Sequence, residues 1–151
     1  MAQTALAASS RNAVVEISSD GSTWYDISGY AQAVSPGDGT RLTGTAFTFD
    51  GTGAIITAGK LDAQESTISI LYTEDTNGAY DRAQGFFNTS NSTCYLRVAP
   101  NGNTSGNFRH TSAKGVITKF PQFHELDASS GDPQMIEFTV QHGGWTRATI
   151  P

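Results

Sequence analysis

Residues 65–73, which read ESTISILYT, carry the clearest secondary-structure signal in this sequence of 151 residues. The two sides of the segment alternate, with Ile68, Ile70 and Tyr72 against Thr67, Ser69 and Leu71. A period of two is typical of a β-strand with one buried face and one open face. The segment therefore predicts a strand whose polar face looks toward water or a channel.

In the segment that follows, residues 77–88, the spacing of the apolar residues changes from two to that of a helix. Tyr80, Ala83 and Phe87 fall at helical spacing behind a possible cap at Thr76 or Asn77. The sequence thus predicts one helix over about 77–88, despite Gly85.

The rest of the chain consists of short β-type segments separated by turns. Asp20-Gly21 is a hairpin signal between segments 14–18 and 23–27. Further strands are expected at 42–50, which alternates like a half-buried strand, and at 54–57, 94–99, 115–120, 135–141 and about 145–150. Segments 28–40 and 100–107 read as loops because they are rich in Gly, Pro and Asn. We predict a mainly β, single-domain sandwich or open barrel of seven or eight strands with one flanking helix.

Composition agrees with this fold class and bounds the function. Ser and Thr supply 34 residues and Gly 16, a balance that favours strands and turns. Residues 1–12 offer only Leu6 for burial, so we expect a flexible arm at 1–12 and one domain at 13–151. The sequence has no apolar run long enough to span a membrane and no signal-peptide pattern, so we expect synthesis in a cytoplasm.

Charge argues against a phosphate-binding surface. The net charge is −5, and residues 42–81 contain six acids against one base, Lys60, while the remainder is balanced. Affinity for nucleic acid depends mainly on Lys and Arg that neutralise phosphates. The acidic segment is either a solvated face or a surface that a polyanion would not bind.

No specific catalytic motif is present. The sequence lacks a nucleophile elbow, a phosphate-binding loop, a zinc-protease helix and a dinucleotide fingerprint. The segment His124-Glu125-Leu126-Asp127 is better interpreted as a solvated loop, and the single Cys94 as a small buried apolar residue. We therefore expect neither an enzyme nor a cofactor or metal site.

The order of these elements resembles that of the major tail tube proteins of long-tailed, siphovirus-like bacteriophages. The matching stretches are Val14–Ser18, Asp20–Trp24, Asp26–Tyr30, Ser66–Tyr72, Ala79–Phe87, Gly115–Pro121 and Glu137–Val140, with Gly143, Gly144 and Thr146. They cover nearly the whole chain. The architecture is also similar to that of type VI secretion tubes and contractile-tail tubes.

The resemblance implies a structural virion protein, located in the tail and made in the host cytoplasm. In that family, hexameric rings join their inner strands into a barrel around a DNA channel and stack into a tube. The implied partners are further copies of the chain and the tape-measure, tail tip and tail terminator proteins. DNA would pass without specific binding, and no membrane is involved.

Within this resemblance we predict two sets of site residues. The channel would be lined by Thr43, Thr45, Asp62, Glu65, Thr67 and Ser69. The stacking loops would contain Ser35, Pro36, Gly37, Asp38 and Gly39, together with Asp50, Gly51 and Gly53. The alternative from another class is a monomeric carbohydrate-binding or adhesion module, with Trp24, Tyr25 and Trp145 as its platform.

Overall fold

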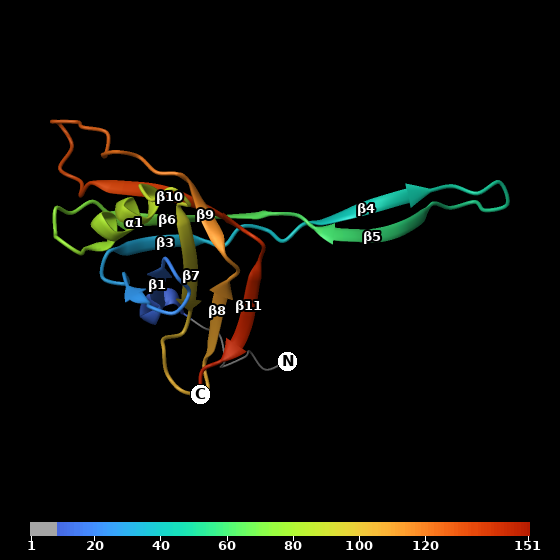
Figure 1. Cartoon of the computed structure of the whole chain (residues 1–151), viewed down its shortest axis with the longest axis horizontal. Coiled ribbons are helices and arrows are strands. Elements are labelled where there is room, and N and C mark those ends of the chain that lie inside the picture. The colour runs from blue at the N-terminus through green and yellow to red at the C-terminus, as the bar shows by residue number, and fades with distance from the viewer. Residues whose placement is uncertain (1–8) are drawn as a thin grey trace, which may run out of the picture.

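The computed structural model describes residues 9–151, which form eleven strands, one α-helix and one 3-10 helix (Figure 1). The elements are η1 (Ser10–Asn12), β1 (Val14–Ser18), β2 (Tyr25–Asp26), β3 (Ala31–Ser35), β4 (Arg41–Ala46), β5 (Ile55–Leu61), β6 (Gln64–Leu71), α1 (Ala79–Phe87), β7 (Thr93–Ala99), β8 (Phe108–Ser112), β9 (Gly115–Lys119), β10 (Met135–His142) and β11 (Trp145–Thr149). The mainly β fold with one helix is confirmed. Residues 1–8 of the expected arm lie outside the described residues.

Nine strands form one bent sheet in the order β11-β8-β7-β9-β10-β6-β3, with β1 and β2 added beside β7. Strand β7 is the corner: its first residues pair with β9, whereas its later residues pair with β8 on that side and with β1 on the other. Figure 1 shows the result as two layers, with β3, β6 and β10 running across the direction of β7, β8 and β11. The open-barrel expectation is met by this arrangement.

The core lies between these layers. Ile17, Ile68, Leu96 and Phe138 are each 0–1% exposed, and α1 closes one end of the core with residues such as Tyr80. Full burial of such an aliphatic or aromatic side chain contributes about 1.5–3 kcal/mol. Hydrophobic burial rather than any disulfide therefore holds the fold together, since Cys94 is a free, buried thiol.

The helix forms where the spacing predicts it, but it begins at Ala79, behind Gly78. Gly78 provides no side-chain cap, and instead the Asp81 carboxylate accepts a hydrogen bond from the backbone N–H of Asn77 at 2.9 Å. The N–H groups of a first helical turn lack intrahelical partners, and a nearby carboxylate stabilises that end. Neither Thr76 nor Asn77 therefore caps the helix, and the Asp81 carboxylate lies at the end where negative charge is favourable.

Two expectations about individual segments are wrong. The stretch 28–40 is not all loop, because Ala31–Ser35 forms β3 and pairs with β6. Residues 108–112 form the additional strand β8, which raises the strand number above seven or eight. Both segments are short and polar or small, and each becomes a strand because a neighbour in the sheet supplies its hydrogen bonds.

Candidate assembly surfaces

A two-stranded ribbon, defined here as residues 41–61, extends away from the rest of the chain (Figure 1). Its strands β4 and β5 pair only with each other, with Thr45 opposite Ile56 and Ala46 opposite Ile55. All residues of both strands are exposed, so the expectation of a half-buried strand at 42–50 is wrong for the single chain. The side chains of β4 alternate between two faces, but neither face packs against the core of the chain.

The ribbon carries large apolar side chains in solvent. Phe47 is 77% exposed, Phe49 is fully exposed and Ile56 is 71% exposed. Three further side chains are at least half exposed, namely Leu42, Ile55 and Leu61. An isolated two-stranded hairpin is marginally stable in water, and large apolar side chains exposed on it indicate an interaction site. The ribbon is therefore a candidate contact for another chain.

The ribbon is attached rigidly to the body at a root formed by residues 35–39. The carbonyl oxygen of Pro36 accepts three hydrogen bonds, from Ser66 Oγ at 2.7 Å, Gln64 Nε2 at 3.0 Å and Trp145 Nε1 at 3.1 Å. Gln64 Nε2 also lies 3.0 Å from the carbonyl oxygen of Gly37. These bonds tie the root to β6 and β11, so the direction of the ribbon is set by the body.

A buried histidine supports this root from below. His142 Nε2 lies 2.7 Å from Ser66 Oγ, and its Nδ1 accepts a hydrogen bond from the N–H of Gly144 at 3.0 Å. Because the Ser66 hydroxyl donates to Pro36, its oxygen accepts from His142, so Nε2 carries a proton; in the neutral ring Nδ1 is the acceptor, and in the charged ring it would donate to the Gly144 carbonyl oxygen 3.1 Å away. Burial lowers the pKa of His142, with a smaller opposing effect from its hydrogen bond to the Gly144 backbone.

The outward face of β6 meets β10 in a polar sheet surface. Glu65, Thr67 and Ser69 stand on this face opposite Gln141, Thr139 and Glu137 of β10, respectively. Ser66, Ile68 and Ile70 point to the other side, into the core, as the alternation predicts. The polar face, defined as these six residues, is a candidate wall, in which Thr139 is buried at 9% exposure.

The structure divides the predicted channel residues between two places. It brings Glu65, Thr67 and Ser69 together on the polar face, but it puts Thr43 and Thr45 on β4 of the ribbon. Asp62 lies in the connection from β5 to β6, where its backbone N–H donates to the Thr40 carbonyl at 2.8 Å. The β10 members of the polar face were missed, although alternation along 135–141 could have identified them.

The predicted stacking residues are also in two places. Ser35, Pro36, Gly37, Asp38 and Gly39 form the ribbon root, while Asp50, Gly51 and Gly53 lie in the turn at its tip. Two residues of the first group, Pro36 and Gly37, contact the body through the hydrogen bonds described above. The tip residues are all exposed.

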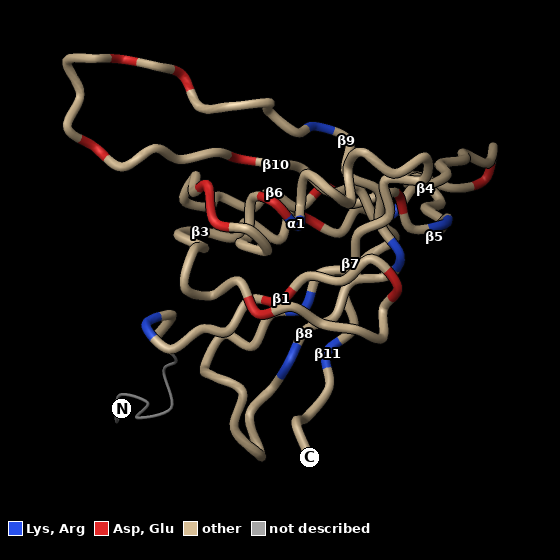
Figure 2. The backbone as a smooth tube through the Cα atoms, turned by 60° about the vertical axis from the view of Figure 1, so that its left-hand side comes forward, with Lys and Arg blue, Asp and Glu red and all other residues tan. Residues whose placement is uncertain are grey.

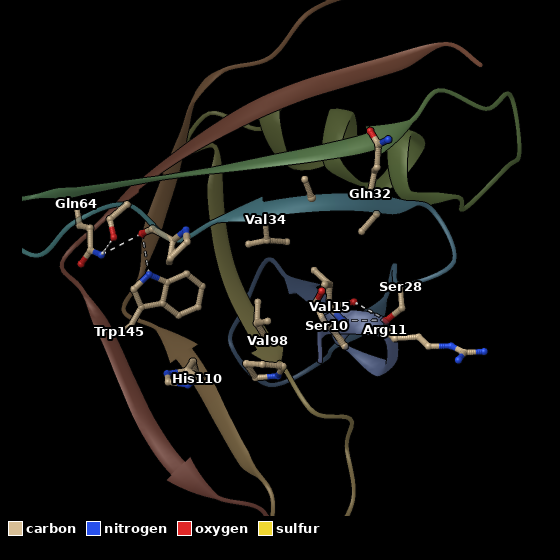
Figure 3. A pocket seen from close by; sticks show the side chains of 16 residues that line it. Ser10, Arg11, Val15, Ser28, Gln32, Val34, Gln64, Val98, His110 and Trp145 are labelled. Atoms are coloured by element: carbon tan, nitrogen blue, oxygen red, sulfur yellow. Dashed lines mark hydrogen bonds between the residues drawn. The ribbon is translucent and has the colours of Figure 1, made fainter. Parts of the chain in front are cut away.

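A groove of about 770 Å³ runs beside β3 (Figure 3). Val34 of β3 lines one side, Val98 of β7 the floor, and His110 of β8 and Trp145 of β11 the opposite side, as Figure 3 shows. Its lining includes Arg11 and His110 but no Asp or Glu. The sequence could not predict the groove, because the residues that line it come from strands far apart in the chain.

The three aromatic residues of the alternative sugar platform are engaged separately. Arg97 lies over the ring of Trp24 at 4.2 Å, and Arg82 lies over Tyr25 at 3.7 Å. Trp145 instead faces the groove and donates to the root. Two of the rings thus each have a guanidinium group over one face, and the third ring lies apart from them at the groove.

Chemistry-bearing residues are dispersed. Burial raises the pKa of the Cys94 thiol to about 12, which keeps it protonated and unreactive at neutral pH. His124, Glu125 and Asp127 lie in the long loop between β9 and β10, which Figure 2 shows projecting from the body with acidic residues along it. Among residues 9–151 there is no cluster of three His, Cys, Asp or Glu side chains that could hold a metal ion.

Helices offer no membrane anchor within the described part of the chain: α1, at nine residues, is too short and too polar to span a bilayer.

Comparisons with known proteins find no relative by sequence but several solved chains with the same fold. No protein-family model matches the sequence, and no curated protein matches it. The structure is similar to a chain of the sheath–tube complex of an extracellular contractile injection system, PVC, with a TM-score of 0.75, 12% identity, and coverage of 97% of this chain and 94% of that chain.

Two further solved structures agree. A chain of the PVC sheath/tube terminator gives a TM-score of 0.72 at 13% identity, covering 92% of this chain and 94% of that one. A chain in the tail of an empty GTA particle, refined with C6 symmetry, gives 0.58 at 11% identity, covering 99% and 100%. At these identities the likeness establishes a shared fold.

Proposed function

We propose that this chain is a non-catalytic structural protein that forms the tube of a phage tail or a phage-tail-like particle. The observation that carries the proposal is the ribbon, whose apolar side chains are exposed in a chain that has the fold of tail components. Such a ribbon would be a liability in a monomer, whereas contact with other copies would bury it. Head-to-tail contact between identical chains produces a ring where its rotation closes and a filament where it does not, so rings that stack head to tail would form a tube.

Ring formation would use the edges of the bent sheet. Strands β3 and β11 end the sheet, so each has a strand partner on one side only. Joining such edges around a ring removes unpaired backbone groups that a small open sheet must otherwise protect. We propose six copies per ring, in line with the resemblance of the sequence and with the C6 symmetry of the similar GTA tail.

The polar face would line the channel. Its accessible hydroxyls and amide, from Thr67, Ser69 and Gln141, offer hydrogen-bonding groups without positive charge. Glu65 and Glu137 add negative charge, which would repel the phosphate backbone and let DNA slide without being held. Under this proposal, Thr43, Thr45 and Asp62 belong to contacts between copies rather than to the wall.

The remaining partners follow from the same role. We propose that the tube meets tape-measure, tail tip and tail terminator proteins, and that the chain resides in the tail of the virion after synthesis in the host cytoplasm. A siphovirus-like tail tube is the first candidate. The tube of a contractile injection system is the second, because solved chains of PVC and of the anti-feeding prophage share the fold.

Electron microscopy of ribbon variants tests the proposal. Wild-type protein at high concentration should form rings or tubes, and the double change Phe47→Ser and Phe49→Ser should abolish them while leaving the circular dichroism spectrum unchanged, since both rings are exposed. The matched control, Phe47→Leu with Phe49→Leu, keeps the apolar surface and should assemble. A wild-type chain that stays monomeric and binds glycans would instead support the sugar-binding module.

The channel assignment has its own test in reconstituted particles. Glu65→Lys with Glu137→Lys should leave tubes intact but slow DNA release, because lysines on the wall would bind phosphates. Glu125→Lys with Asp132→Lys, two exposed acids in the loop between β9 and β10, is the matched control. Unchanged release from Glu65→Lys, Glu137→Lys tubes would place the polar face outside the channel.

A further inference from the structure

His142 lies next to the point where the ribbon joins the body and contacts two of the side chains that hold that point. It is the last residue of β10 and is 3% exposed. Its Nε2 lies 2.7 Å from Ser66 Oγ, and its ring meets the Trp145 ring edge-on, with the ring centroids 5.1 Å apart. Ser66 and Trp145 both donate to the Pro36 carbonyl of the root, and Figure 3 shows the Trp145 bond. A change at His142 therefore reaches the root through two side chains.

The neutral ring of His142 matches its partners. Nε2–H donates to Ser66, and Nδ1 accepts from the N–H of Gly144 at 3.0 Å. The carbonyl oxygen of Gly144 lies 3.1 Å from the same Nδ1, but it already accepts from the backbone N–H of Ala113 at 2.9 Å. Each ring nitrogen thus has a complementary partner as long as Nδ1 carries no proton.

A proton on Nδ1 disrupts this arrangement. Both nitrogens of the charged ring are donors, so Nδ1–H would face the N–H of Gly144, which is also a donor. The ring would also carry a buried positive charge, which costs free energy unless an opposite charge compensates it. The turn from His142 to Trp145 contains two glycines, and Gly144 has a φ of +124°. Because glycine adopts either sign of φ with similar ease, this turn can reorganise and move Trp145 with it.

No carboxylate hydrogen-bonds to His142 in the part of the chain that the structure describes. The titratable and charged groups on the elements around it are Glu65 on β6, Asp38 in the root, Lys114 before β9, His110 on β8 and Arg147 on β11. Both acids are exposed, and Glu65 stands on the polar face of β6, on the side opposite Ser66. A charged His142 ring therefore lacks a counter-ion in the folded chain.

We propose that His142 is a pH-sensitive switch at the ribbon root: protonation of its ring frees the Pro36 carbonyl from Ser66 and Trp145 and lets the ribbon swing. This inference rests on the proposed tube-forming function and names how that function is regulated. The fixed root holds the neutral ring and the loosened root holds the charged ring, so the fixed root is lost progressively as the pH falls below about 6.5. A swinging ribbon loses more conformational entropy when another copy binds it. Tubes should therefore be stable at neutral pH and come apart in mild acid.

Distance measurements between two spin labels test the switch in the free, full-length chain. One label is attached at Thr52→Cys in the ribbon turn and the other at Ser22→Cys in the β1–β2 turn, both at exposed positions, while Cys94 is buried and stays unlabelled. Pulsed electron paramagnetic resonance at pH 7.5 should give one narrow distance distribution. At pH 5.5, where the carboxylates remain ionised, the fraction of distances outside that peak should rise at least about threefold, with a limit of about tenfold set by one pH unit.

Variants at the three histidines assign the response. His142→Gln keeps a donor for Ser66 but cannot gain a charge, so its distribution should stay narrow at both pH values. The matched control, His110→Gln with His124→Gln, leaves His142 as the sole histidine and should keep the whole response. This control also decides the matter if circular dichroism shows that His142→Gln is unfolded. An unchanged wild-type distribution, a response that persists in His142→Gln, or a response lost in the control would each overturn the switch.

Light scattering of tubes separates this inference from the proposed function. Wild-type tubes should dissociate at pH 5.5 and re-form at pH 7.5, whereas His142→Gln tubes should persist at both. Wild-type tubes that persist at pH 5.5 would overturn the regulation of assembly and leave the tube-forming role standing. Absence of tubes at either pH would overturn the tube-forming role, while the spin-label distances would still decide whether His142 controls the ribbon.

Discussion

Replacing Gly37 by alanine should loosen the ribbon root, whereas the same change two residues away should not. Gly37 has a φ of +70°, and a Cβ placed there would lie 1.9 Å from the carbonyl oxygen of Glu65 and 3.0 Å from its carbonyl carbon. Gly39 is the matched control, because its Cβ would meet only Gln64 Oε1 at 3.9 Å, an ordinary contact.

The expected loss of stability follows from these contacts. Left-handed backbone at a residue with a Cβ costs about 1–2 kcal/mol. The overlap with Glu65 must also be relieved by moving the root away from β6, which strains the hydrogen bonds from Ser66 and Gln64 to Pro36, each worth about 1 kcal/mol. We therefore expect Gly37→Ala to lower the free energy of unfolding by about 3 kcal/mol.

Urea unfolding at low protein concentration, followed by tryptophan fluorescence, measures this loss, since Trp145 contacts the root directly. Gly39→Ala should fall within about 0.5 kcal/mol of wild type or be slightly stabilising, because alanine restricts the unfolded chain. In assembly assays Gly37→Ala should form fewer or irregular tubes. If Gly37→Ala proves as stable as Gly39→Ala, the root is not fixed in the way that the hydrogen bonds indicate.

Three further predictions concern the body of the protein. Phe138→Ala should lower the free energy of unfolding by about 3–5 kcal/mol, measured in urea, whereas Phe123→Ala, at a side chain that is 64% exposed, should change it little. Because burial lowers the pKa of His142 below its usual 6.5, the folded chain binds fewer protons than the unfolded chain. The free energy of unfolding should therefore fall as the pH drops below about 6.5. His142→Gln should flatten that dependence between about pH 5 and 7. The Cys94 thiol should resist a thiol reagent at pH 8 in the native chain and react once in urea, and rapid native labelling would contradict its burial.

The spacing of apolar residues predicted those elements in which one face of a single strand or helix packs against the core. The alternation over 65–73 identified β6 and its inward residues correctly, and helical spacing identified α1. In both cases, side chains of one element face one core, so period and burial coincide. The β10 part of the polar face follows the same rule at 135–141, where it was open to prediction but was not used.

Non-local pairing explains what the sequence did not predict. Ala31-Gln32-Ala33 has little β-propensity and stands next to Gly29 and Pro36, yet it is a strand because β6 supplies its hydrogen-bond partners. The groove depends on β3, β7, β8 and β11 meeting, and no spacing in the sequence encodes that meeting. Register between β6 and β10 likewise determines which polar residues share a face.

In the ribbon, the alternating pattern predicted the strand correctly but predicted the burial of its side chains wrongly. Residues 42–50 alternate as a half-buried strand does, but the single chain buries neither side of them. If the pattern reflects burial at all, the covering surface belongs to another molecule, and a fixed root is what allows a slender two-stranded arm to meet that surface in one orientation. An arm free to swing would lose conformational entropy on docking, whereas one held by the hydrogen bonds at Pro36 has lost much of it already during folding. The stiffness of the root should therefore determine assembly affinity, so that Gly37→Ala weakens association even at temperatures where the body remains fully folded.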